Sequence, residues 1–188
     1  MLMSFLGGSK VRRILIQDYI RPDKSKRILD LCCGPCDILP HLEYLEYVGV
    51  DFSEEYIRHC KKEFSTRENT TFIVKDVNAF LNETDSSAKF DIVLLIGGMH
   101  HIDDASLLTL LHNIKKVLTP TGRLVTLDGC FEPQLSWITR KILASDRGQF
   151  VRTKEAWVKI FTSVFKDYQC VTRKDLLRIP YNHIIFYK

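Results

Sequence analysis

Long apolar runs are missing from the sequence. The longest uncharged one, Ile92 to Met99, is far shorter than the roughly 20 residues that a helix needs to cross a bilayer. The opening residues, MLMSFLGGSK, have no basic segment ahead of their apolar side chains and no long apolar stretch. We therefore predict no signal peptide and no membrane association, and we expect a cytoplasmic protein.

A second pair of closely spaced cysteines is also missing. Cys33 and Cys36 form one C-x-x-C spacing next to Cys32, but the other three of the six cysteines are isolated along the chain. A structural zinc site usually takes four ligands from two such pairs. We therefore expect no metal and interpret the thiols as reduced and mostly buried.

The chain contains no block of charge of one sign. Lys and Arg number 27 and Asp and Glu 23, which gives a net charge of +4, and the basic pairs are scattered. Such pairs are typical of solvated helix faces, so we expect no nucleic-acid partner. With 188 residues, 45% of them hydrophobic and no internal repeat, residues 1–188 are expected to form one domain.

Strand-like and helix-like segments alternate along the chain, which predicts an α/β protein with a doubly wound, mostly parallel sheet of seven strands. A helix with Val11 and Leu15 on its apolar face should open the fold and stop at Pro22. The expected strands cover residues 27–33, 47–52, 71–75, 90–96, 123–128, 168–173 and 183–187. Since no helix separates the last two, they should be antiparallel neighbours.

Three further helices are predicted from apolar side chains at helical spacing. The first should begin at Ser53 as its N-cap, and Asp103 should cap the second. A turn over residues 119–122 should separate the second helix from the fifth strand. The apolar faces are Tyr56, Ile57, Cys60 and Phe64; Leu107, Leu111, Ile114 and Leu118; and Trp157, Ile160, Phe161 and Val164.

The residues that end the strands are the candidate functional residues, because open parallel sheets bind ligands beyond the carboxyl ends of their strands. Gly34 lies in a tight turn after the first strand, where it lets the backbone approach a ligand. Asp51 ends the second strand and can accept bonds from two ribose hydroxyls. Asp76 follows the third strand, where it can accept a bond from an adenine amino group or simply form a turn.

The motifs ILDLCCGPCD, YVGVDFSEEYI, FIVKDV, FDIVLLIGGMHHIDD and IKKVLTPTGRLVTLD, in this order, resemble those of class I S-adenosylmethionine-dependent methyltransferases. The resemblance covers about residues 27–130 and implies a Rossmann-like fold, with the closing strands as its antiparallel hairpin. It places Asp30 and Gly34 at the methionine end of the cofactor, Asp51 at the ribose and Asp76 at the adenine amine. The implied cofactor contacts together are Asp30, Cys32, Gly34, Asp51, Phe52, Asp76, Val77 and Ile96.

The turn after the first strand departs from that family. The family usually has glycine at three alternate positions, which here are Cys32, Gly34 and Cys36. Each cysteine adds a Cβ where backbone should approach the cofactor. A non-catalytic binding protein on the same scaffold is therefore one alternative to the enzyme.

His100 and His101 follow the fourth strand, where the nucleophile of an acceptor should approach the methyl group. A histidine with a pKa near 6.5 can take a proton at neutral pH, so either is a candidate general base. The alternative is that one packs or forms a hydrogen bond while the other faces solvent.

Residues 131–152 are expected to form an insert over the acceptor. Trp137, Arg147 and Arg152 are its candidate lining residues, and the arginines could pair with a carboxylate or phosphate or with surface acids.

The sequence thus predicts methyl transfer from S-adenosylmethionine to a small-molecule acceptor, with S-adenosylhomocysteine as the other product. A nicotinamide-dependent dehydrogenase is disfavoured because the three glycines of G-x-G-x-x-G would be Cys32, Gly34 and Asp37. An RNA methyltransferase is the nearer alternative. Gly97 to His100 stands where amino-directed nucleic-acid enzymes carry an Asn/Asp-Pro-Pro-aromatic tetrad. The methylated atom and the oligomeric state do not follow from the sequence.

Overall fold

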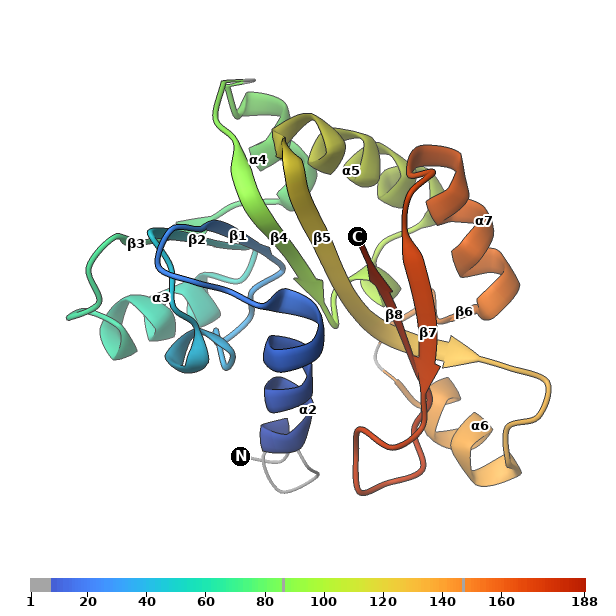
Figure 1. The fold of residues 1–188 in the computed structure, drawn as a ribbon. Coiled ribbons are helices and arrows are strands. Elements are labelled where there is room, and N and C mark those ends of the chain that lie inside the picture. The colour runs from blue at the N-terminus through green and yellow to red at the C-terminus, as the bar shows by residue number, and fades with distance from the viewer. Residues whose placement is uncertain (1–7, 86, 147) are drawn as a thin grey trace.

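A sheet with strand order β3-β2-β1-β4-β5-β8-β7 runs through the computed structural model, which describes residues 8–85, 87–146 and 148–188 (Figure 1). The short strand β6 pairs with β5 off this path. The strands are β1 (Arg27–Leu31), β2 (Glu46–Asp51), β3 (Thr70–Val74), β4 (Phe90–Ile96), β5 (Leu118–Phe131), β6 (Arg152–Thr153), β7 (Gln169–Arg173) and β8 (His183–Tyr187).

Strands β1 to β5 are mutually parallel, so their carboxyl ends meet at one edge of the sheet. Strand β8 is antiparallel to both β5 and β7. The predicted α/β fold, its mostly parallel sheet and its closing antiparallel pair are therefore confirmed. The order of strands turns back between β1 and β4, and this is where ligands bind in such sheets.

Helices cover both faces of the sheet (Figure 1). The α-helices are α2 (Gly8–Ile14), α3 (Glu54–Glu63), α4 (Val77–Glu83), α5 (Asp104–Val117), α6 (Trp137–Ala144) and α7 (Lys154–Val164). A π-helical turn, η1 (Leu15–Ile20), extends α2, and two 3-10 turns are η2 (Leu39–His41) and η3 (Met99–His101). The first predicted helix thus ends before Pro22.

Alternation along the strands divides the core into two clusters, because successive side chains point to opposite faces. Leu29 and Leu31 pack with residues of α4, α5 and α7. Ile28 packs on the other face with residues of α2, η1 and α3. The predicted apolar faces of α5 and α7 are buried on the first side, for example Leu107 and Trp157.

The prediction missed one helix and misplaced the start of β5. Helix α4 was not predicted, although Asp76 caps it with a side-chain oxygen that accepts a bond from the Ala79 amide at 3.0 Å. Leu118 was assigned to a helix but begins β5. The expected turn over 119–122 is an irregularity within β5. Phe90 of β4 pairs with Leu118 and Ile92 pairs with Arg123, so the pairing register shifts between these two pairs.

The predicted start of α3 is confirmed, since the Ser53 hydroxyl accepts a bond from the Tyr56 amide. Asp103 likewise caps α5 through the Ala105 and Ser106 amides. Tyr56 was predicted on the apolar face of α3 but is 45% exposed. Within the described residues, no helix has the length and apolarity needed to traverse a bilayer.

Candidate active site at the carboxyl ends of the strands

The turn after β1 keeps the backbone conformation of a glycine turn. Cys32, Gly34 and Cys36 have φ angles of 55°, 52° and 56°. Left-handed backbone costs a residue with a Cβ about 1–2 kcal/mol, so the surroundings must hold the two cysteines there. Cys36 is completely buried. Both cysteines therefore adopt the left-handed conformation that favours glycine.

Three thiols converge on one carbonyl of this turn. The Sγ atoms of Cys33, Cys36 and Cys60 lie 3.8, 3.9 and 3.3 Å from the Gly34 oxygen. A hydrogen bond from the Cys36 thiol to Cys33 is the largest cause that raises the pKa of Cys36, and a bond from the Cys60 thiol to Cys36 does the same for Cys60. Burial raises the pKa of Cys32 to about 12. Protonated thiols at neutral pH are poor metal ligands and poor nucleophiles.

No group of three or more His, Cys, Asp and Glu side chains is arranged to hold a metal ion in the ranges 8–85, 87–146 and 148–188. All six cysteines are free.

Asp51 holds the β1 turn against the start of α3. Its side chain is buried, with Oδ2 accepting a bond from the Gly34 amide and Oδ1 from the Ser53 amide, both at 2.9 Å. A carboxylate has about four acceptor sites, so each oxygen can accept a further bond. Phe52, directly after it, is 78% exposed, which is unusual for a large apolar side chain.

Asp30 lies in β1, just before the turn, and is only 3% exposed. The Tyr47 hydroxyl donates to its Oδ2 at 2.6 Å. Burial raises the pKa of Asp30 to about 7 against the opposing effect of this bond. The Tyr47 hydroxyl also lies 3.6 Å from the Cys36 sulfur, so Tyr47 links Asp30 to the turn.

Asp76 and Val77 form the start of α4. Asp76 is exposed and its Oδ1 caps the helix, whereas the Val77 side chain is buried in the core. The amides of a helix's first turn have no partner within the helix, so the backbone of Val77 is available as a donor. Both the predicted adenine contact and the alternative turn role of Asp76 fit this position.

The turn after β4 packs against the turn after β1. Gly97 has a φ of 68°, and Ile96 before it is partly exposed. A Cβ placed on Gly98 would lie 2.7 Å from the Cβ of Cys32, so the two turns touch. By contrast, a Cβ on Gly34 or Gly97 would meet nothing within 4 Å. The two turns thus present backbone to open space.

His100 is fixed between two carboxylates. Its Nδ1 lies 2.5 Å from Asp128 Oδ1 and its Nε2 3.3 Å from Asp146 Oδ1, and the residue is 8% exposed. Burial by itself lowers the pKa of His100, but the bond to Asp128 and the charges of both acids outweigh it and raise the pKa. A histidine with both nitrogens engaged is a poor proton acceptor, so His100 does not fit the role of general base.

His101 is exposed and lies over the His100 ring, with ring centres 4.2 Å apart. Burial and the neighbouring charge of His100 lower the pKa of His101. The lowered pKa favours the neutral imidazole, so of the two predicted bases His101 is the better placed to accept a proton.

Arg152 does not line a site for an acceptor, contrary to prediction. It is 7% exposed and its five N–H groups face Asp104 and the carbonyls of Met99, Ile102 and Phe150. The guanidinium also lies over the Trp157 ring at 4.6 Å. Arg152 thus joins η3, β6 and the start of α5 as a structural clamp.

Trp137 begins α6 and is 71% exposed, with Ile138 beside it 44% exposed. The insert also covers His100, since a Cβ on Gly148 would overlap the His100 ring and the Phe150 amide donates to the His100 carbonyl. Arg147, the third predicted lining residue, lies outside the described residues.

Asp128 was missed by the sequence analysis. It is 2% exposed and accepts bonds from the Met99 and Gly129 amides as well as facing His100. It lies where the predicted fifth strand ends, so the rule that selected Asp51 and Asp76 could have found it.

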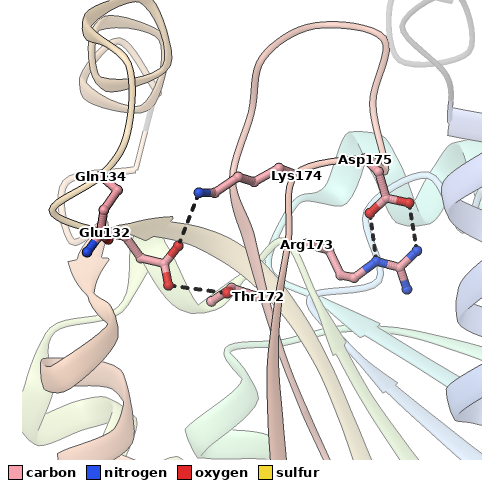
Figure 2. Close-up of a pocket in the computed structure, with 6 residues that line it drawn as sticks. All are labelled: Glu132, Gln134, Thr172, Arg173, Lys174 and Asp175. Carbon is pink, nitrogen blue, oxygen red and sulfur yellow. Dashed lines mark hydrogen bonds and ion pairs between the residues drawn. The ribbon is translucent and has the colours of Figure 1, made fainter.

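A polar pocket of about 650 Å³ lies between the ends of β5 and β7 (Figure 2). Lys174 and Thr172 point toward Glu132, with atoms 3.9 and 3.2 Å from its carboxylate. Arg173 makes two bonds to Asp175 at 2.7 and 2.8 Å. The charged groups of this pocket therefore pair with one another.

Comparison with known proteins identifies the class to which this fold and site belong. Residues 28–122 match the family model described as a methyltransferase domain, and the chain belongs to that family. It is an S-adenosylmethionine-dependent methyltransferase, as the resemblance implied.

Three similar proteins illustrate the relationship. A demethylmenaquinone methyltransferase of Staphylococcus epidermidis is 25% identical over 173 residues, which cover 85% of this chain and 70% of the relative. One of Leptospira interrogans is 31% identical over 120 residues, or 59% of this chain and 47% of the relative. The crystal structure of an S-adenosylmethionine-dependent methyltransferase from Archaeoglobus fulgidus has a TM-score of 0.73 at 16% identity, covering 100% and 97% of the chains.

Proposed function

We propose that this enzyme methylates a small aromatic molecule at the carboxyl edge of its sheet. The observation that carries the proposal is the open space beside Gly34 and Gly97, the two turns that face each other across β1 and β4. Backbone that faces open space at the switch point of a parallel sheet suits a nucleoside ligand. S-Adenosylmethionine, when bound, supplies an electrophilic methyl group on a sulfonium.

The side chains around these turns fit that cofactor. We assign Asp51 to the ribose hydroxyls, because its oxygens are already oriented by two amides and each can accept another bond. Exposed Phe52 offers an apolar surface to the adenine, and Asp76 with the Val77 amide offers an acceptor and a donor to its edge. We place Cys32, Gly34 and Ile96 along the floor of the site, while Asp30 acts on the turn through Tyr47.

Exposed apolar side chains on the insert favour an aromatic acceptor. Trp137 and Ile138 are exposed together on α6, next to the carboxyl edge of the sheet. Exposed large apolar groups on one helix commonly mark a binding surface. The relatives named demethylmenaquinone methyltransferases act on a quinone, and we extend an aromatic acceptor of this kind to the present chain.

We assign the general base to His101. Its lowered pKa favours the neutral imidazole and its side chain is exposed, so it can take the proton of an acceptor hydroxyl as the acceptor attacks. The Asp128–His100 pair positions η3, because it ties His100 and the Met99 amide to β5. Alignment of the acceptor supplies most of the rate in a displacement of this kind.

The test is formation of S-adenosylhomocysteine with a panel of a hydroquinone, a simple phenol, an alkylamine and a short RNA. We expect turnover with the hydroquinone or phenol. Trp137→Ala should raise the KM for that acceptor about tenfold, and His101→Ala should lower kcat about 10²-fold. Turnover with RNA alone would contradict the proposal and favour a nucleic-acid substrate.

A further inference from the structure

Four polar side chains from distant parts of the sequence form a chain of contacts around the end of β5. Tyr181, in the loop between β7 and β8, donates its hydroxyl hydrogen to Asp146 Oδ2 at 2.7 Å. The other oxygen of Asp146 lies 3.3 Å from His100 Nε2, and His100 Nδ1 lies 2.5 Å from Asp128 Oδ1. Polar contacts thus join this loop, the insert, η3 and β5.

The Tyr181 hydroxyl lies against the backbone of Gly129, the residue that follows Asp128. A Cβ on Gly129 would be 2.5 Å from the hydroxyl oxygen and 3.1 Å from a methyl group of Leu143 on α6. The ring of Tyr181 also contacts the ring of His183, with centres 4.6 Å apart. Glycine at this position therefore leaves room for the hydroxyl and brings the chain of contacts back to β5.

The bond between Tyr181 and Asp146 joins a neutral donor to a carboxylate. Burial is the largest cause that raises the pKa of Tyr181, and the bond to Asp146 raises it further. The hydroxyl therefore keeps its proton at neutral pH. Hydrogen bonds to charged groups are stronger than those between neutral groups, so this bond can fix the orientation of the Asp146 carboxylate.

His100 connects these contacts to the base that we assigned. Asp128 faces one of its ring nitrogens and Asp146 the other. His101 is the next residue of the three-residue turn η3, and its ring lies 4.2 Å from that of His100. A change in the orientation of Asp146 would therefore move the His100 ring and, with it, the ring of His101.

We propose that Tyr181 is a positioning residue for methyl transfer, which acts on His101 through Asp146 and His100. This inference rests on the proposed function, in which His101 takes the proton of the acceptor. A small displacement of a catalytic group lowers the rate, because the reacting atoms are no longer aligned. Since we assign the binding of the acceptor and of the cofactor to other residues, the loss should fall on kcat.

Tyr181→Phe tests the proposal, because it removes the hydroxyl and keeps the ring. The control is Tyr187→Phe, which removes a hydroxyl that donates to the Gln169 side chain at 2.6 Å. Initial rates are measured with the acceptor of the panel that turns over fastest. We expect Tyr181→Phe to lower kcat about tenfold and to leave the KM values for acceptor and S-adenosylmethionine within about twofold. Tyr187→Phe should change none of them.

A double variant tests the path through the insert. Asp146→Ala should also lower kcat, and adding Tyr181→Phe to it should lower kcat no further, because the acceptor of the hydroxyl bond is already gone. Unchanged kcat in Tyr181→Phe, a lower melting temperature alone, or full additivity of the two losses would overturn the assignment and leave the proposed function intact. If folded wild-type protein turned over no acceptor of the panel, the proposed function would fail and this inference with it.

Discussion

The β1 turn combines a glycine backbone with cysteine side chains, and one neighbouring glycine makes this possible. Gly98 leaves room for the Cβ of Cys32, which a Cβ on Gly98 would approach to 2.7 Å. The left-handed φ of 55° at Cys32 thus depends on a residue more than sixty positions away in the chain. A departure from the family's glycines at one turn is accommodated by a glycine at the other.

This dependence predicts the result of a double substitution. Gly98→Ala should lower the free energy of unfolding by about 1–3 kcal/mol, because its methyl group overpacks the turn. Adding Cys32→Gly should recover most of that loss, since it removes both contacts closer than 3.4 Å. Urea denaturation of the wild-type protein, both single variants and the double variant measures the coupling. Simple additivity of the two single effects would show that the turns do not touch.

The two adjacent histidines should titrate on opposite sides of their ordinary pKa of 6.5. The pKa of His100 is raised and that of His101 lowered. NMR spectra of the imidazole carbons against pH should resolve both, with His101 losing its proton first as the pH rises. Asp128→Asn should lower the pKa of His100, because it removes the negative charge bound to Nδ1. An unchanged His100 titration in that variant would contradict the ion pair.

The raised pKa of His100 also links it to stability. The folded state holds the His100 proton more tightly than the unfolded chain does, so the contribution is complete below pH 6.5. It is lost as the pH rises through the pKa of the folded state. His100→Gln should therefore be less stable than the wild-type protein at pH 6, with a smaller difference at pH 9. A difference independent of pH would contradict the charged pair.

Among the elements, those with a clear period and a capping residue were predicted from the sequence, and the short ones were not. Helix α5 has Asp103 as its cap and buried apolar residues such as Leu107 and Leu111, so its start was correct. Helix α4 is a seven-residue helix whose cap, Asp76, had been interpreted only as a strand-end acid. Short helices give little periodicity to detect.

The candidate site was predictable where it follows from strand ends and not where it depends on distant contacts. Asp51 and the two turns lie where the parallel strands end, as expected. The bonds of Arg152 to the carbonyls of Met99 and Ile102, and the attachment of His100 to Asp128 and Asp146, depend on how residues far apart in sequence pack together. A sequence pattern contains no information on which of two neighbouring histidines turns inward.

Asp76 has two roles that a pair of substitutions can separate. Serine is as good an N-cap as aspartate, whereas alanine costs about 1 kcal/mol. Asp76→Ser should therefore keep the stability of α4 and weaken S-adenosylhomocysteine binding about tenfold, because the carboxylate is gone. Asp76→Ala should lose both stability and affinity. If Asp76→Ser bound the ligand as well as the wild-type protein does, Asp76 would be only a cap.

Arg152 joins elements that the sheet alone does not hold together. Arg152→Met should lower the free energy of unfolding by about 3 kcal/mol, because three carbonyls and Asp104 lose their donor. Urea denaturation checks this, with the exposed Arg13→Met as the control. A loss below 0.5 kcal/mol, about that of a surface substitution, would contradict the clamp.

The molecule as a whole brings its functional groups to one edge. Strands β1, β2 and β4 deliver the two turns and Asp51, while α2 and the insert 131–152 approach the same edge from elsewhere in the chain (Figure 1). We propose that the sheet supplies the site of the cofactor that family membership implies. The insert and η3 supply the acceptor side, which stays a proposal. This division explains why the reaction could be predicted from motifs and the acceptor could not.

The central claim is that Asp51 and the β1 turn bind S-adenosylmethionine. Calorimetric titration of the wild-type protein, Asp51→Asn and the exposed control Asp85→Asn tests it most directly. We predict micromolar binding, about −8 kcal/mol, for the wild-type protein and the control. Asp51→Asn should lose it, because an amide nitrogen would face the Gly34 or Ser53 amide. Equal affinity in all three proteins, or no binding by folded wild-type protein, would contradict the account.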